Sequence, residues 1–197
     1  MESTSPGPDL GLAQVVEEYR VTANIGTLFD RVRAIAVGSD PEQLARAARP
    51  YADMPEVVIP AYEYIVSKRP ADAQAMVVLA NAYWLTGRGP DVVGALARRA
   101  KEADDGNRGA WHLWALSEPD LRTRVQRWRD VARRFPQDQL ARAALADNAV
   151  SLATAEDDPA ALDLAIVTYE GLLAEASRID QRLALESTLQ ALKKRHR

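Results

Sequence analysis

The chain has 197 residues, of which 47% are hydrophobic and 27% are charged, so it can build a sizeable core and solvate it. Its net charge of −3 at pH 7 provides no global attraction to nucleic acid, and the absence of cysteine excludes disulfides, thiolate nucleophiles and thiolate metal sites. The apolar residues are dominated by alanine, leucine and valine, a bias that favours helices.

Residues 1–8 are rich in serine, proline and glycine and are predicted to form a disordered leader. This segment lacks the basic and apolar regions of a secretory signal peptide. No apolar run in the chain approaches the roughly 18 residues that a membrane span requires. We therefore expect a cytoplasmic protein that does not associate with a membrane.

Residues 9–38 are predicted to form an N-terminal helical segment. Asp9 is a candidate N-cap, and the apolar residues that follow it recur at helical spacing. Gly26 lies between two such apolar sets. It either separates two helices or lies inside one.

From residue 39 onwards the pattern predicts one helix after another, with no alternating strand pattern. Ser39 or Asp40, followed by Pro41, indicates a helix start. Pro60 predicts a kink in the next helix or a later start for it. Short breaks are expected at 70–72, 87–90, 104–108, 117–119, 136–138 and 156–159.

The helix starts recur at a nearly constant interval. Taking Ser39, Ala73, Arg108 and Gln139 as the starts of successive units gives intervals of 34, 35 and 31 residues. Short helices that recur in this way cannot bury their apolar faces alone, so a fixed period predicts stacked helix pairs. The alternative is an irregular helical bundle whose intervals coincide.

The segment "LANAYWLTGR", residues 79–88, carries the clearest motif. Leu79, Ala80, Tyr83 and Gly87 are followed by Val93, Ala97 and Ala100, and this unit resembles the tetratricopeptide repeat, a helix–turn–helix of 34 residues. The resemblance implies an all-α, right-handed α-solenoid of stacked antiparallel helix pairs over residues 39–177. Residues 178–197 would then supply a C-terminal capping helix, with Ile179, Leu183 and Leu189 facing the stack, and a basic tail.

The resemblance also implies a function. Repeats of this family commonly bind a peptide or helix of another protein in a concave groove, so we expect a non-enzymatic interaction module or scaffold. The family's groove positions correspond here to Gln74, Val77, Asn81, Trp84, Leu85, His112, Leu116 and Asp147. Family members that hold a C-terminal carboxylate carry Lys or Arg where this chain has Val77, His112 and Ala143, which argues against that mode of binding.

A second candidate surface is the arginine-rich helix predicted at 121–135. Leu121, Val125, Trp128, Ala132 and Phe135 form one apolar stripe. The remaining surface offers Arg122, Arg127, Arg129, Arg133 and Arg134 as a face for an anionic partner. Because the whole chain is acidic, we expect an acidic protein surface or a second copy of the chain rather than nucleic acid.

Catalytic chemistry has little support in the sequence. The two histidines, His112 and His196, are isolated, and metal sites need several convergent ligands. We therefore predict no catalytic residues, no metal and no cofactor. An enzyme with an unrecognised cleft based on carboxylates is the alternative from a different class.

Overall fold

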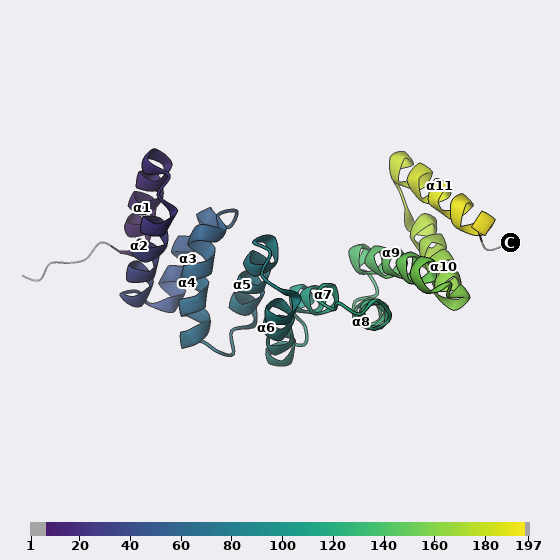
Figure 1. Cartoon of the computed structure of the whole chain (residues 1–197), viewed down its shortest axis with the longest axis horizontal. Coiled ribbons are helices and arrows are strands. Elements are labelled where there is room, and N and C mark those ends of the chain that lie inside the picture. Colours follow the sequence, from purple (N-terminus) through teal and green to yellow (C-terminus); the bar gives the residue numbers. More distant parts are fainter. Residues whose placement is uncertain (1–6, 196–197) are drawn as a thin grey trace, which may run out of the picture. The chain divides into compact units, whose positions relative to one another are not determined.

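The computed structural model describes residues 7–195 and shows helices joined by short connections (Figure 1). No strand occurs within this range, so the predicted all-α class is confirmed. The helices are α1 (Pro8–Thr22), α2 (Ile25–Val37), α3 (Pro41–Ala48), α4 (Pro55–Lys68), α5 (Ala73–Leu85), α6 (Pro90–Ala103), α7 (Arg108–Leu116), α8 (Leu121–Arg134), α9 (Gln139–Glu156), α10 (Pro159–Glu175) and α11 (Ile179–Arg195). A short 3-10 helix, Arg49–Tyr51, follows α3.

Two helices form the N-terminal segment. Ala23 adopts the left-handed conformation that ends α1, and the Asn24 side chain accepts a hydrogen bond from the Thr27 backbone N–H to begin α2. Gly26 therefore lies in the first turn of α2. The prediction that Asp9 caps the first helix is wrong: Gly7 is the N-cap, and Pro8 begins the helix because its fixed φ suits that position. Residues 1–6 of the predicted leader, and His196, lie outside the described range.

The predicted starts at Ala73, Arg108 and Gln139 are confirmed. The first repeat starts slightly later than expected, because Asp40 is the N-cap and α3 begins at Pro41. Aspartate is the usual cap in this chain, since its carboxylate accepts the backbone N–H three residues onward. This arrangement occurs at Asp40, Asp72, Asp120, Asp138 and Asp158.

Pro60 does not delay its helix. Helix α4 begins at Pro55 and continues through Pro60 to Lys68. A proline at this position removes one intrahelical hydrogen bond near the start of the helix. The buried side chains of Val57, Ile59 and Ile65 anchor the helix on both sides of that defect.

The chain divides into two compact units, one ending at Leu113 and the other beginning at Trp114. In the first unit, α1 pairs with α2, α3 with α4, and α5 with α6. Successive pairs also stack, through contacts of α1 with α3, α2 with α4, and α4 with α5. The N-terminal segment therefore supplies one more helix pair in front of the predicted repeats.

Small residues bring α5 and α6 together. Ala80, Ala97 and Ala100 are fully buried and Tyr83 is nearly so, which leaves space for the two helices to approach closely. Gly87 then closes the turn with a φ of 74°, a conformation that suits glycine. The Arg88 N–H bonds to the Tyr83 carbonyl across it. The burial of these residues and the contact between α5 and α6 agree with the packing role inferred for "LANAYWLTG".

In the second unit, α8 packs against α9, α9 against α10, and α10 against α11. Helix α11 takes the position expected of a cap. The predicted contact face is only partly right, because Leu189 is buried whereas Ile179 and Leu183 are 77% and 61% exposed. The inward side of α11 instead carries Leu185, Leu189 and Leu192, so Leu189 is the one residue that it shares with the predicted contact face.

Candidate partner-binding surface

One face of α5 is left out of the core. The buried side of this helix includes Met76, Leu79 and Tyr83, and the opposite side carries the predicted groove residues. Asn81 is exposed, and the neighbouring Trp84 and Leu85 are 38% and 66% exposed. These positions recur at helical spacing and therefore share one side of the helix.

The N-terminal half of the same face contacts the beginning of α7. Gln74 accepts a 3.3 Å hydrogen bond from the Asn107 side-chain amide. A Cβ on Gly109 would lie 3.0 Å from Val77, so glycine permits this close approach of the two helices. His112 is half-buried one turn further along α7. Gln74 and Val77 are therefore partly used in holding the first unit together, which leaves Asn81, Trp84 and Leu85 as its more accessible members.

The two remaining predicted groove residues belong to the second unit. Leu116, at the end of α7, is 37% exposed. Asp147 on α9 accepts a hydrogen bond from the Tyr169 hydroxyl on α10. Burial, followed by this hydrogen bond, raises the pKa of Tyr169. The Asp147 carboxylate thus serves the packing of its own helix pair.

A pocket of about 400 Å³ opens between α3, α4 and α5 in the first unit, and we call it the α3–α5 pocket. Its wall includes the predicted residue Gln74. Sequence analysis missed its other members. They are Glu42, Ala45, Arg46, Ala48, Arg49, Ala52, Val58, Tyr62, Arg69, Asp72, Ala75 and Val78.

The missed residues have a simple relation to the predicted ones. Helix α3 begins 32 residues before α5, so the positions of Gln74, Val77 and Asn81 correspond to Glu42, Ala45 and Arg49. All three line the pocket. We call the surface formed by these positions of α5, of α3 and of the 3-10 helix that follows it, together with Trp84 and Leu85, the first-helix face.

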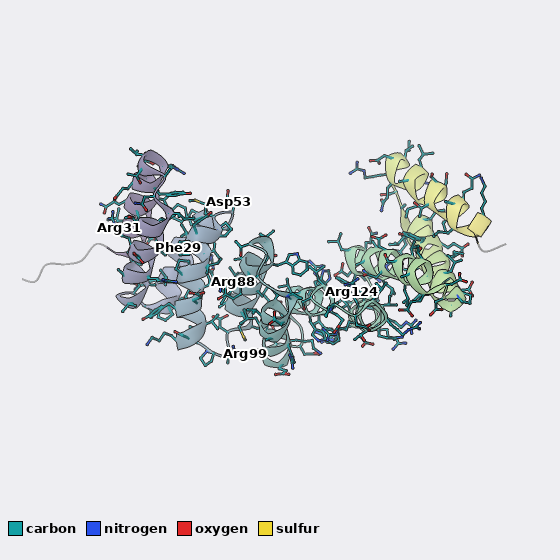
Figure 2. All side chains as sticks on the ribbon, in the orientation of Figure 1. Phe29, Arg31, Asp53, Arg88, Arg99 and Arg124 are labelled. Carbon is teal, nitrogen blue, oxygen red and sulfur yellow. The ribbon has the colours of Figure 1, made fainter. Side chains whose placement is uncertain are left out.

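Most arginine side chains of helix α8 form ion pairs or hydrogen bonds with other groups of the protein. Arg122 pairs with Glu156 and Asp158 through contacts of 2.6 and 2.9 Å. Arg124, which is labelled in Figure 2, donates to the Asn148 side chain at 2.8 Å and to the Glu118 carbonyl at 2.9 Å. These partners lie on α9 and in the connections on either side of the α8–α9 pair.

Arg127 is the most deeply engaged arginine of this helix. It pairs with the Glu118 carboxylate, donates to the Trp114 carbonyl at 2.8 Å, and lies 4.7 Å from the centre of the Trp114 ring. Arg129 donates to Gln126, Arg133 pairs with Asp130, and Arg134 lies over Phe135. Arg122, Arg124 and Arg127 therefore hold the second unit together, whereas Arg129 and Arg133 contact near neighbours on α8 itself, and an anionic-partner face on this helix stays a prediction.

Within residues 7–195, no group of three or more His, Asp or Glu side chains is arranged to hold a metal ion. The same range contains no helix that is long and apolar enough to cross a bilayer.

No protein-family model and no curated protein sequence matches the chain. Solved structures do match it. TTC0263, a thermophilic TPR protein in Thermus thermophilus, aligns over 93% of this chain and 99% of its own, with 18% identity and a TM-score of 0.55. The fold is that of a tetratricopeptide repeat protein. The MamA protein aligns over 87% of this chain and 97% of its own, with 12% identity and a TM-score of 0.60. At these identities the likeness to tetratricopeptide repeat structures establishes the fold.

Proposed function

We propose that the protein is a non-enzymatic interaction module that binds a peptide or helix of another protein on the first-helix face of its first unit. The observation that carries the proposal is the side-by-side exposure of Trp84 and Leu85 on a helix whose opposite side is fully packed. Tryptophan is costly to leave in water, and it is among the residues that contribute most to protein interfaces. Stacked helix pairs generally use such extended surfaces to bind partners.

Asn81 adds a polar group beside this apolar pair. It is exposed on the same side of α5, one turn before Trp84 and Leu85. An asparagine side chain both donates and accepts hydrogen bonds, so it can pair with the backbone of an extended segment. An apolar pair next to an amide suits a short peptide or an amphipathic helix.

The test begins with selection of peptides from a random displayed library on the immobilised full-length chain. A selected peptide is labelled, and its affinity is measured by fluorescence anisotropy. Replacing Asn81 and Trp84 together by alanine should weaken binding by at least about 10-fold, because a tryptophan at an interface typically contributes about 2 kcal/mol or more. Both residues are exposed, so far-ultraviolet circular dichroism should be unchanged.

Val167→Ala is the matched control, since Val167 is a 66% exposed apolar residue on α10 in the second unit. This variant should bind like the unmodified chain. Peptides that bind equally well to the Asn81/Trp84 double variant would place the interaction surface elsewhere.

A further inference from the structure

Tyr62 is an unusual residue within the α3–α5 pocket. Its side chain lines the pocket, and the residue is only 9% exposed. Among the described residues, its hydroxyl has no hydrogen-bond partner. The hydroxyl oxygen is not among the fully buried, unpaired side-chain atoms of the described residues, so it is open to the water in the pocket. It can therefore donate a hydrogen bond to a ligand that enters the pocket.

Two guanidinium groups border the same space. Arg46 and Arg49 line the pocket, are exposed, and form no ion pair with any described residue. They differ in this respect from the arginines of α8. Arg49 lies close enough to Tyr62 to act on its phenol: burial raises the pKa of Tyr62 and Arg49 opposes that rise. The phenol therefore remains a protonated donor at neutral pH.

The two carboxylates in the pocket wall do not cancel the positive charge of Arg46 and Arg49. Asp72 already accepts the Ala75 backbone N–H at 3.0 Å and pairs with Arg69 at 3.3 Å. Glu42 lines the pocket without an ion pair to any described residue. Three guanidinium groups against two carboxylates leave one net positive charge in the wall.

We propose that the α3–α5 pocket binds a single Asp or Glu side chain of the partner segment, held by Arg46, Arg49 and the Tyr62 hydroxyl. This rests on the proposed function and adds the chemistry of the partner. Guanidinium groups pair with carboxylates through two parallel hydrogen bonds, and the phenol supplies a further donor. One net positive charge matches a carboxylate better than a phosphate, which carries about two negative charges.

The surrounding wall indicates what flanks the acidic residue. Ala45, Ala48, Val58 and Val78 form an aliphatic lining on α3, α4 and α5. An apolar side chain next to the carboxylate would contact this lining. The expected partner motif is therefore one acidic residue with an apolar neighbour, presented by the same segment that lies along Asn81 and Trp84.

The experiment compares peptides selected on the full-length chain with those selected on the Arg46→Gln/Arg49→Gln double variant. Peptides from the unmodified chain should be enriched in Asp or Glu at one position, and the double variant should lose that enrichment. A synthetic amidated copy of a selected peptide is then tested with its acidic residue as Glu, Gln or phosphoserine. We expect the Gln copy to bind at least about 10-fold more weakly than the Glu copy, since a charge-assisted hydrogen bond is lost, and phosphoserine to give no gain.

Tyr62→Phe separates a specific contact from general charge attraction. It should weaken the Glu peptide several-fold and the Gln peptide less, because the hydroxyl bonds a charged carboxylate more strongly than a neutral amide oxygen. Peptides that bind and depend on Asn81 and Trp84, yet show no acidic preference, would overturn this inference and leave the proposed function intact. Failure to select any peptide would overturn both. Tighter binding of phosphoserine than of Glu would replace the carboxylate with a phosphorylated partner.

Discussion

The Tyr83 hydroxyl on α5 donates a 2.7 Å hydrogen bond to the Glu63 carboxylate on α4, which ties two successive helix pairs together. Arg88 completes the cluster by stacking 4.2 Å from the centre of the Tyr83 ring and lying 3.8 Å from Glu63. This hydrogen bond connects the repeat formed by α5 and α6, which carries the clearest motif, to the repeat formed by α3 and α4. It also makes the stability of the first unit sensitive to high pH.

Burial, followed by the hydrogen bond to Glu63, raises the pKa of Tyr83 from 10.0 to about 12. The folded state thus retains a proton that the unfolded state releases between these values. The protonated Tyr83 hydroxyl therefore stabilises the folded state fully below pH 10, and this stabilisation is lost as the pH rises to about 12. Urea unfolding of the unmodified chain and of Tyr83→Phe, measured from about pH 8 to about pH 11.5, tests this.

Tyr83→Phe should lower the free energy of unfolding by about 1 kcal/mol at about pH 8, because one hydrogen bond is lost. The other tyrosines and the lysines titrate in both proteins, so the difference between the two curves isolates Tyr83. That difference should narrow above about pH 10. A constant difference over the whole pH range would contradict the raised pKa.

The close approach of α5 and α6 leads to a second prediction. Ala100 is fully buried, so Ala100→Leu forces three extra carbon atoms into a filled contact. We expect it to lower the free energy of unfolding by about 1–3 kcal/mol in denaturant titration. Ala95→Leu is the control, since Ala95 is exposed on the same helix, and it should change stability by no more than about 0.5 kcal/mol. Equal effects at the two sites would contradict the packing role of the small residues.

Arg127 is expected to stabilise the folded protein. Its removal leaves the Glu118 carboxylate, whose side chain is 11% exposed, without this cation. Arg127→Ala should therefore cost roughly 2 kcal/mol of unfolding free energy. Arg133→Ala should cost less than about 0.5 kcal/mol, because Arg133 is 73% exposed and its ion pair is at the surface. Thermal and urea unfolding of both variants would measure this difference in unfolding free energy. Equal losses of stability in the two variants would contradict the structural role of Arg127.

Nucleic-acid binding by α8 is the last case to test. Because Arg122, Arg124 and Arg127 are engaged by groups of the protein, few cations remain for phosphates. We expect no sub-micromolar binding of labelled single- or double-stranded oligonucleotides at about 0.15 M salt, near physiological ionic strength. Binding that disappears in Arg133→Glu/Arg134→Glu would instead make α8 a phosphate-binding surface.

Much of the architecture could be predicted because its signals are local. An aspartate that caps a helix acts on a backbone N–H three residues away, and a proline at the first position acts on its own φ. Asp72 and Asp138 therefore mark α5 and α9 in the sequence itself. The α5 positions Asn81, Trp84 and Leu85 were implied by the resemblance to the tetratricopeptide repeat, and they are exposed.

The side-chain partners required the tertiary structure. Arg122 meets Glu156 from 34 residues away, and Arg124 meets Asn148 from 24 residues away. Nothing in the local pattern of α8 distinguishes such arginines from solvated ones, so the sequence could not show that Arg122, a member of the predicted anionic-partner face, pairs within the protein. The α3–α5 pocket depends likewise on Tyr62, which one helix places between residues of two others. Backbone capping and periodicity are set within a few residues along the chain, whereas charge pairing and burial depend on which helices the fold brings together.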